Sequence, residues 1–391
     1  MAETAQFVLQ PHQDIELERP RHDLELFATL PSSGVNEKTG LLLILDDFSG
    51  FANSVYQAQE VRPYLADRYN LVVAGLNYFG IDRKRSIEIR NGFLQNLRRI
   101  YGISLDTGNM TDQNQFFGEV AAQLARKGVV MLDQRCQPVV MDGRGEYQSW
   151  GFLPAIDGLQ SVGFLLGKYP QLDRQRVSVY GQGYGGYIAG LMAKFAPRTF
   201  ATVIDKDGFV KTELKHVATG ELLDPGEFME IPFSDFPIPF RYSVMFESPW
   251  TIEDEENAGY FSDSHRKIRS LLLPEHHQAS DTRYYLFQGT DDRFGVAAAR
   301  DRYATLLQKF HPVQYKKLPP VELGTNHQEL FDQVAAAETE NFCKAEADND
   351  FSLNRTYTLS CGEKSYVFAF RDDYSLQVSV KQSRRNKVKC E

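Results

Sequence analysis

A glycine-rich turn at residues 181–186 joins a short β-branched strand to a run that favours a helix. This strand–turn–helix pattern carries a nucleophilic serine in G-x-S-x-G motifs, where a strained turn exposes the hydroxyl. Gly181, Tyr184 and Gly185 occupy flanking positions of that motif, but the position of the serine holds Gly183. We therefore predict the backbone of a nucleophile elbow without the attacking hydroxyl.

Two later segments offer the acid and the base that such a nucleophile needs. A predicted strand ends at Gly289, and the third residue after it is Asp292, with Asp291 as the fallback acid. His327 follows in a predicted loop before a helix. Nucleophile, acid and histidine in this order form a triad in which the carboxylate orients the histidine as a general base. We predict that Asp292 and His327 lie near Gly183.

Acyl transfer also needs N–H donors that stabilise the negative oxygen of the tetrahedral intermediate. The residue after the nucleophile position usually supplies one of them, and here it is Tyr184. The second donor is expected in the loop that follows the apolar run 41–45, and the N–H of Phe48 is the best candidate there. These two N–H groups make up the predicted oxyanion hole.

With these motifs the chain resembles the α/β-hydrolase superfamily over residues 20–345, and its prolyl-oligopeptidase and acyl-esterase branch in particular. Elbows of that branch often read G-x-S-x-G-G-Y, which residues 181–187 match except at Gly183. The stretch 180–205 also resembles an uncharacterised bacterial hydrolase-like family, some of whose members are associated with flagellin glycosylation loci. The resemblance implies a hydrolase or acyltransferase scaffold for an acyl ester or an acylated sugar, impaired in serine chemistry and without a cofactor.

Two alternatives of other classes stay open. The protein could be a non-catalytic binding protein in a glycosylation or surface pathway. Gly181, Gly183 and Gly186 also form G-x-G-x-x-G, with Asp205 about 20 residues on, which is the fingerprint of an NAD-type oxidoreductase. Against that second alternative, the unit lies in mid-chain, and no second mononucleotide-binding half follows it.

Composition narrows the range of partners. The chain has 391 residues and a net charge of −9, which argues against nucleic acid as a main partner. No apolar run reaches the length of a membrane span, and the first residues lack the features of a signal peptide. The four cysteines show no metal-binding spacing, so we expect no metal and a reducing, cytoplasmic location. A small-molecule or acylated glycan substrate is expected, and the oligomeric state stays open.

Short apolar strands alternate with helical stretches along most of the chain. This alternation predicts a mostly parallel sheet with helices on both faces, and the resemblance given above implies that it is the α/β-hydrolase fold. We assign residues 1–350 to this domain, with a lid or cap inserted at about 208–282. A small β appendage with a basic tail is predicted over residues 351–391. The predicted elements are strands at 5–10, 22–30, 41–45, 71–74, 129–132, 201–204, 284–287 and 313–318, and helices at 54–69, 93–100, 113–126, 150–169 and 296–310.

Overall fold

The computed structural model divides into two compact units, and each is described by itself. Unit 1 comprises residues 1–82, 148–212 and 252–391, and unit 2 comprises residues 83–147 and 213–251. The structure describes residues 3–47, 50–81, 83–84, 91–105, 113–130, 132–136, 139–142, 146–212, 217, 229–231, 240–242, 245–246, 249–252, 254–289, 297–319, 327–337 and 356–382.

Unit 1 is built on an eight-stranded sheet with the order β1-β2-β4-β3-β8-β9-β13-β14. Its strands are β1 (Glu3–Leu9), β2 (Leu24–Leu30), β3 (Gly40–Leu45), β4 (Leu71–Asn77), β8 (Val177–Gln182), β9 (Thr202–Lys206), β13 (Arg283–Gly289) and β14 (Val313–Leu318). The pairs β1–β2 and β2–β4 are antiparallel and the others are parallel. An antiparallel opening followed by a parallel sheet, with the glycine turn after the central strand β8, defines the α/β-hydrolase fold. The predicted fold class is confirmed.

Strand register brings the carboxyl ends of the central strands to one edge of the sheet. Leu45 of β3 pairs with Gly181 of β8, and Gln182 of β8 pairs with Lys206 of β9. These strands are buried along nearly their whole length because helices cover both faces. Residues that follow β3, β8 and β9 therefore start from the same edge, where ligands bind in open α/β sheets.

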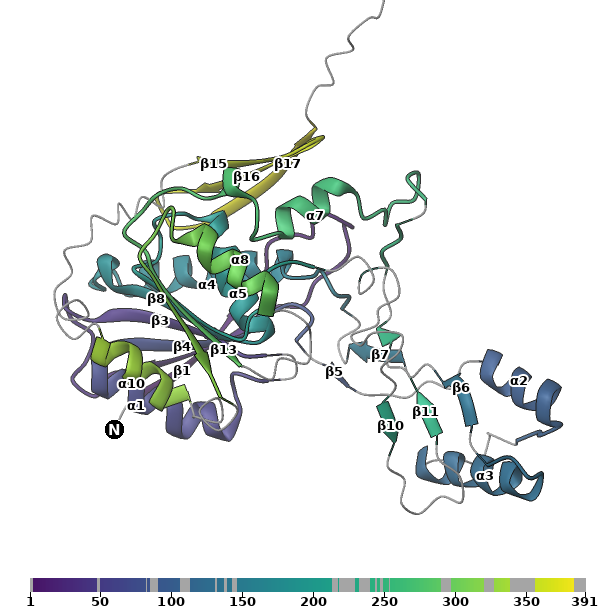
Figure 1. The fold of residues 1–391 in the computed structure, drawn as a ribbon. Helices are drawn as coiled ribbons and strands as arrows, with labels where there is room; N and C mark the ends of the chain where they lie inside the picture. Colours follow the sequence, from purple (N-terminus) through teal and green to yellow (C-terminus); the bar gives the residue numbers. More distant parts are fainter. Residues whose placement is uncertain are drawn as a thin grey trace, which may run out of the picture. The chain divides into compact units, whose positions relative to one another are not determined.

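Helices cover the two faces of this sheet in separate groups (Figure 1). The π-helix η1 and helices α1 and α10 share one apolar core with β3, β8, β9 and β13, to which Val61, Leu65, Leu330 and Phe331 contribute. Helices α4, α5 and α8 lie on the opposite face (Figure 1). The helices of unit 1 are η1 (Gln57–Val61), α1 (Arg62–Tyr69), α4 (Phe152–Lys168), η3 (Arg174–Arg176), α5 (Tyr184–Phe195), α7 (Asp263–Arg269), η4 (Pro274–His276), α8 (Ala297–Leu307) and α10 (His327–Ala337).

The described residues near the C-terminus form a three-stranded antiparallel meander. It consists of β15 (Thr356–Cys361), β16 (Lys364–Phe370) and β17 (Leu376–Gln382), which pair antiparallel in that order. Aromatic contacts attach it to helices α4 and α5. Phe368 stacks on Phe195 of α5 at 4.6 Å between ring centroids, and Tyr366 packs edge-on against Phe152 of α4 at 5.3 Å. The meander is thus part of the core of unit 1.

Unit 2 has its own apolar core between two helices, formed by Leu97, Ile103, Phe116, Phe117, Val120, Ala121 and Leu124. Its elements are α2 (Asn91–Tyr101), α3 (Gln113–Arg126), one sheet of β10 (Met229–Ile231), β11 (Phe240–Tyr242) and β6 (Leu132–Cys136), and another of β12 (Met245–Phe246), β7 (Val139–Asp142) and β5 (Arg83–Lys84). Described residues between 252 and 282 belong to unit 1. The lid role of residues 208–282 stays a prediction.

The strand predicted at residues 129–132 was placed wrongly. The strand β6 begins only at Leu132, and it pairs with β11 in unit 2 instead of joining the central sheet. Val130 is 84% exposed. The residues that follow Leu132 are polar, so this segment lacks the continuous apolar run that a strand buried on both faces requires. A short apolar run alone was too weak a signal to locate the strand.

A buried ion pair joins α8 to the central sheet. Arg300 is fully buried and donates to the Asp205 carboxylate at 2.8 Å and to the carbonyl of Gly208 at 2.6 Å. A second nitrogen of Arg300 reaches the carbonyl of Phe287 at 3.2 Å. The guanidinium therefore holds together the ends of β9 and β13, which are two of the strands that carry the site.

Replacing Arg300 by methionine should lower the free energy of unfolding by about 3 kcal/mol, because the substitution leaves the Asp205 carboxylate buried without its cation. Urea unfolding at pH 7 measures the loss. The matched control is Arg302→Met on the same helix, where the side chain is exposed; it should change stability by less than about 0.5 kcal/mol. Equal effects of the two substitutions would contradict this role of Arg300.

Candidate active site at the elbow after strand β8

The turn between β8 and α5 has the strained backbone of a nucleophile elbow. Gly183 adopts φ 54° and ψ −119°, in the left-handed half of conformational space that glycine tolerates best. Its N–H donates to the carbonyl of Lys206 at 2.8 Å, which fixes the turn against the end of β9. The structure thus provides the predicted backbone conformation, while the catalytic role of position 183 stays a prediction.

The loop after β3 lies against this turn without a gap. A Cβ atom built on Gly185 would overlap the carbonyl of Leu45 and would come within 2.7 Å of the carbonyl oxygen of Asp46. Only glycine allows the first turn of α5 to approach the end of β3 so closely. This approach determines which side chains of the β3 loop can reach the elbow.

The space where a side chain on Gly183 would begin is occupied by the carboxyl group of Asp47. The three atoms nearest to a Cβ built on Gly183 all belong to the Asp47 carboxyl group; Oδ1 would lie at 2.6 Å, and Cγ and Oδ2 closer still. Asp47 Oδ1 also accepts a hydrogen bond from the N–H of Tyr184 at 2.8 Å. The predicted oxyanion donor Tyr184 is therefore bound to a carboxylate, which the positive end of the α5 dipole also favours.

The neighbouring carboxyl group, Asp46, is mostly buried. Burial raises the pKa of Asp46 to about 6, and the charge of Asp47 acts in the same direction. Gln57 Nε2 donates to Asp46 Oδ1 at 3.0 Å, and this bond and the Arg62 charge act against the rise. Asp46 therefore takes up a proton as the pH falls to about 6.

His327 is the first residue of α10 and reaches the elbow strand. Its Nδ1 lies 2.6 Å from the hydroxyl of Tyr180, and the two rings meet edge-on at 5.2 Å between centroids. Burial, together with the nearby Lys206 charge, lowers the pKa of His327 to about 4. The imidazole is therefore neutral at pH 7 and able to accept a proton.

Two interactions link His327 to the segments that flank or hold Gly183. Tyr180 precedes Gly183 by three residues on β8, and Lys206, whose charge acts on His327, holds the N–H of Gly183 through its carbonyl. The predicted acid Asp292, its fallback Asp291 and the predicted oxyanion residue Phe48 lie outside the described residues. Their roles, and the base role of His327, stay predictions.

Sequence reasoning also missed a carboxyl group that follows β9 at this edge. Asp207 follows β9 with a positive φ of 56°, and its Oδ1 accepts the N–H of Gly289 at 2.7 Å. Burial raises the pKa of Asp207. The available signal was a polar residue directly after a buried parallel strand, and the same signal applies to Asp46 and Asp47 after β3. We use the name elbow cluster for Asp46, Asp47, Tyr180, Tyr184, Lys206, Asp207 and His327.

The surroundings of Asp205 argue against the dinucleotide alternative. A ribose-binding carboxylate must be open to its ligand, but Asp205 is 1% exposed and bound to Arg300 and to the N–H of Gly208. A Cβ built on Gly186 would overlap the Asp205 carboxylate, so this glycine serves the packing of α5 against β9. The glycines are thus explained without a pyrophosphate.

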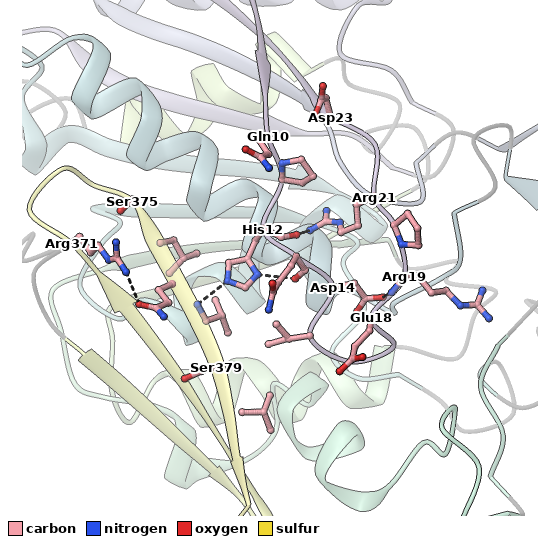
Figure 2. A pocket seen from close by; sticks show the side chains of 18 residues that line it. Gln10, His12, Asp14, Glu18, Arg19, Arg21, Asp23, Arg371, Ser375 and Ser379 are labelled. Carbon is pink, nitrogen blue, oxygen red and sulfur yellow. Dashed lines mark hydrogen bonds between the residues drawn. The ribbon is translucent and has the colours of Figure 1, made fainter.

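A large cavity of about 1210 Å³ lies elsewhere in unit 1, between residues 10–23 and residues 371–380. In Figure 2 the ring of His12 lies in this region and contacts both walls. Its Nε2 accepts the N–H of Val378 at 3.0 Å, and its Nδ1 lies 2.8 Å from the carbonyl of Gln13. Burial lowers the pKa of His12, which preserves the neutral ring that this bridge requires. The cavity does not include the elbow cluster.

Within the parts of the chain that the structure describes, no group of three or more His, Cys, Asp or Glu side chains is arranged to hold a metal ion. None of the helices among the described residues is long and apolar enough to cross a membrane.

The sheet order and strand directions of unit 1 are those of the α/β-hydrolase fold. Residues 6–309 match the family described as "Protein of unknown function (DUF2920)", and the chain belongs to that family. A search of curated proteins gives no match.

Solved structures with a similar arrangement include acylaminoacyl peptidase of Pyrococcus horikoshii, with 15% identity, a TM-score of 0.47, and coverage of 88% of this chain and 42% of that one. An arylesterase has 12% identity, a TM-score of 0.46, and coverage of 88% and 86%. Esterase 2 of Thermogutta terrifontis has 12% identity, a TM-score of 0.42, and coverage of 87% and 92%. The chain spans about two fifths of the length of the peptidase. Likenesses at these scores establish no shared activity.

The imidazole of His327 should titrate near pH 4 in the folded protein, because burial and the Lys206 charge both disfavour its protonation. The chemical shift of the Cε1–H proton of His327, followed by NMR as a function of pH, measures this pKa. Lys206→Met should raise the pKa of His327, whereas Lys211→Met, five residues along, should not. A reaction that needs the neutral imidazole should persist at pH 5 and disappear as the pH falls through about 4. A pKa near 6.5 for His327 in the wild-type protein would contradict the buried position of its imidazole.

Proposed function

We propose that this protein is a hydrolase-family scaffold for an acyl ester or an acylated sugar in which covalent serine chemistry does not operate. The observation that supports it best is the position of Asp47: its carboxylate lies where the side chain of a nucleophilic serine would begin. The elbow backbone and the position of the Tyr184 N–H also support a scaffold of the acyl-transfer type. The proposal includes the small acylated ligand and the cytoplasmic location expected from the sequence.

A serine at position 183 alone would not restore the chemistry. Its Cβ would meet the Asp47 carboxyl group, so one of the two side chains would have to move. The Tyr184 N–H, which has to stabilise the oxyanion of an acyl substrate, is already bound to Asp47 at 2.8 Å. Any variant that tests the serine scaffold must therefore also remove the carboxylate.

The wild type and the Gly183→Ser variant should both fail to react with a fluorophosphonate, while the double variant Gly183→Ser with Asp47→Ala should be labelled at the new serine. The double variant should also hydrolyse p-nitrophenyl acetate at least about tenfold faster than the wild type, a small part of the factor of about 10⁶ that an intact serine contributes. Mass spectrometry of labelled peptides and release of p-nitrophenolate are the measurements.

The single variant Asp47→Ala is the matched control, because it opens the site without supplying a hydroxyl. Circular dichroism shows whether each variant is folded. Labelling of the wild type at any serine near the elbow would contradict the proposal. An inert double variant with a native spectrum would show that the elbow is not a serine scaffold.

A non-catalytic binding protein is the second candidate, and one contact favours it. An oxyanion donor that is occupied by a carboxylate is not available to polarise the carbonyl of a substrate. Calorimetric titration with O-acetylated monosaccharides, followed by analysis of the same samples for released acetate, separates the two functions. Binding without release supports the binding protein, and release supports a hydrolase.

A further inference from the structure

We propose that the groove between residues 10–23 and strand β17 binds an extended peptide segment of another protein, which adds to the outer edge of β17 as a further antiparallel strand. This groove is the cavity of about 1210 Å³ whose lining is drawn in Figure 2. It does not include the elbow cluster, so the inference concerns a second site and does not depend on the proposed function.

Strand β17 has one paired and one unpaired edge. It pairs with β16, and within the described part of the chain no strand pairs with its other edge. The N–H of Arg371 donates to the carbonyl of Ser375 at 2.9 Å, which fixes the alternation: every second residue from Ser375 onward bonds to β16. Leu376, Val378 and Val380 therefore direct their N–H and C=O groups away from β16, toward the cavity that they line.

The N–H of Val378 shows what this edge binds. It donates to His12 Nε2 at 3.0 Å, in a bond that a carbonyl of a neighbouring strand would otherwise accept. Figure 2 shows the ring of His12 beside β17. Proteins cover exposed strand edges because such edges pair with other chains. His12 therefore caps the edge in the unbound protein, and a peptide carbonyl replaces its Nε2 as the acceptor on binding.

The wall opposite β17 is fixed by its own hydrogen bonds. Asp14 is buried and accepts the N–H of Glu16 at 3.0 Å. Arg21 donates to the carbonyl of His12 at 2.7 Å and to the two carboxylate oxygens of Asp157 at 2.6 and 2.7 Å. The groove is therefore formed before a peptide enters, which lowers the entropic cost of binding.

The lining of the groove favours a polypeptide backbone over a small molecule. The cavity of about 1210 Å³ exceeds the roughly 300–1,000 Å³ of most small-ligand pockets. Its described lining contains no Phe, Tyr or Trp on which a flat ring could stack. It offers instead a row of N–H and C=O groups with a period of two residues, which an extended chain matches.

The side chains of the groove indicate an uncharged peptide with apolar residues at alternate positions. Leu376, Val378 and Val380 share one face of β17, and Val378 is buried there. Residues directly opposite them in an antiparallel partner lie on the same face, so apolar side chains fit these positions. The three acidic and three basic side chains of the lining balance in charge. Because residues 376–380 line the cavity, a peptide of about five residues spans it.

The test uses the full chain and the peptide Thr-Val-Thr-Val-Thr amide, with fluorescein joined to its N-terminus through two glycines. Fluorescence anisotropy of the peptide should rise to saturation as the protein is added. N-methylation of both valines should raise Kd at least about tenfold, because these residues turn their N–H groups toward β17. N-methylation of the second and third threonines is the matched control. These N–H groups point away from β17, so Kd should change less than about threefold.

Two substitutions on β17 locate the site. Val380→Asp should raise Kd at least about tenfold, because it places a carboxylate on the apolar face of the groove. Lys381→Asp introduces the same residue at the exposed neighbouring position, on the other face of the strand, and should change Kd less than about twofold. His12→Ala should lower Kd about fivefold, because the peptide no longer has to displace the cap. Circular dichroism checks the fold of each variant.

Absence of an anisotropy change with the folded wild type at concentrations up to about 1 mM would overturn the inference. Equal effects of the two N-methylated peptides would show that the peptide does not pair with a strand edge, and would overturn it as well. Unchanged binding to a folded Val380→Asp variant would place the peptide elsewhere. Weaker binding to His12→Ala would contradict the role of His12 as a displaceable cap.

Discussion

The close approach of the β3 loop to the first turn of α5 is the constraint on which this site depends. Gly185 permits it, because any side chain there would overlap the carbonyl of Leu45. The approach carries Asp47 to the N–H of Tyr184, at the positive end of a helix of 12 residues. A helix N-terminus that lacks its own side-chain cap thus receives a carboxylate from another part of the chain. The same carboxylate leaves no room for a side chain on Gly183.

Most of the fold could be predicted from the sequence because its strands carry strong local signals. The run from Leu41 to Leu45 is buried at every position, as a central parallel strand requires, and the later strands of the sheet alternate with helices. Residues 129–132 misled the prediction because four apolar residues carry no information about which sheet they join. That choice depends on the pairing of β6 with β11, more than 100 residues away in the chain.

The site could be predicted only where sequence spacing reports on backbone geometry. Gly183 and His327 could be proposed as site residues because a glycine turn after a strand and a histidine before a late helix match the chain order of the fold; their roles stay predictions. Asp47 was missed because nothing local distinguishes it from Asp46; which of the two side chains reaches Tyr184 is decided by tertiary packing. Asp207 was missed for a similar reason, since its bond to Gly289 joins the ends of two strands.

Charge explains why the two adjacent carboxyl groups take different roles. Burial raises the pKa of Asp46 to about 6, and repulsion from Asp47 contributes to this rise. Each carboxyl group has a hydrogen-bond donor, Gln57 Nε2 for Asp46 and the Tyr184 N–H for Asp47, but only the donor of Asp47 lies at the positive end of a helix. The negative charge is therefore stabilised on the residue that faces the empty elbow position. A negative charge at this position repels the developing oxyanion of an acyl substrate.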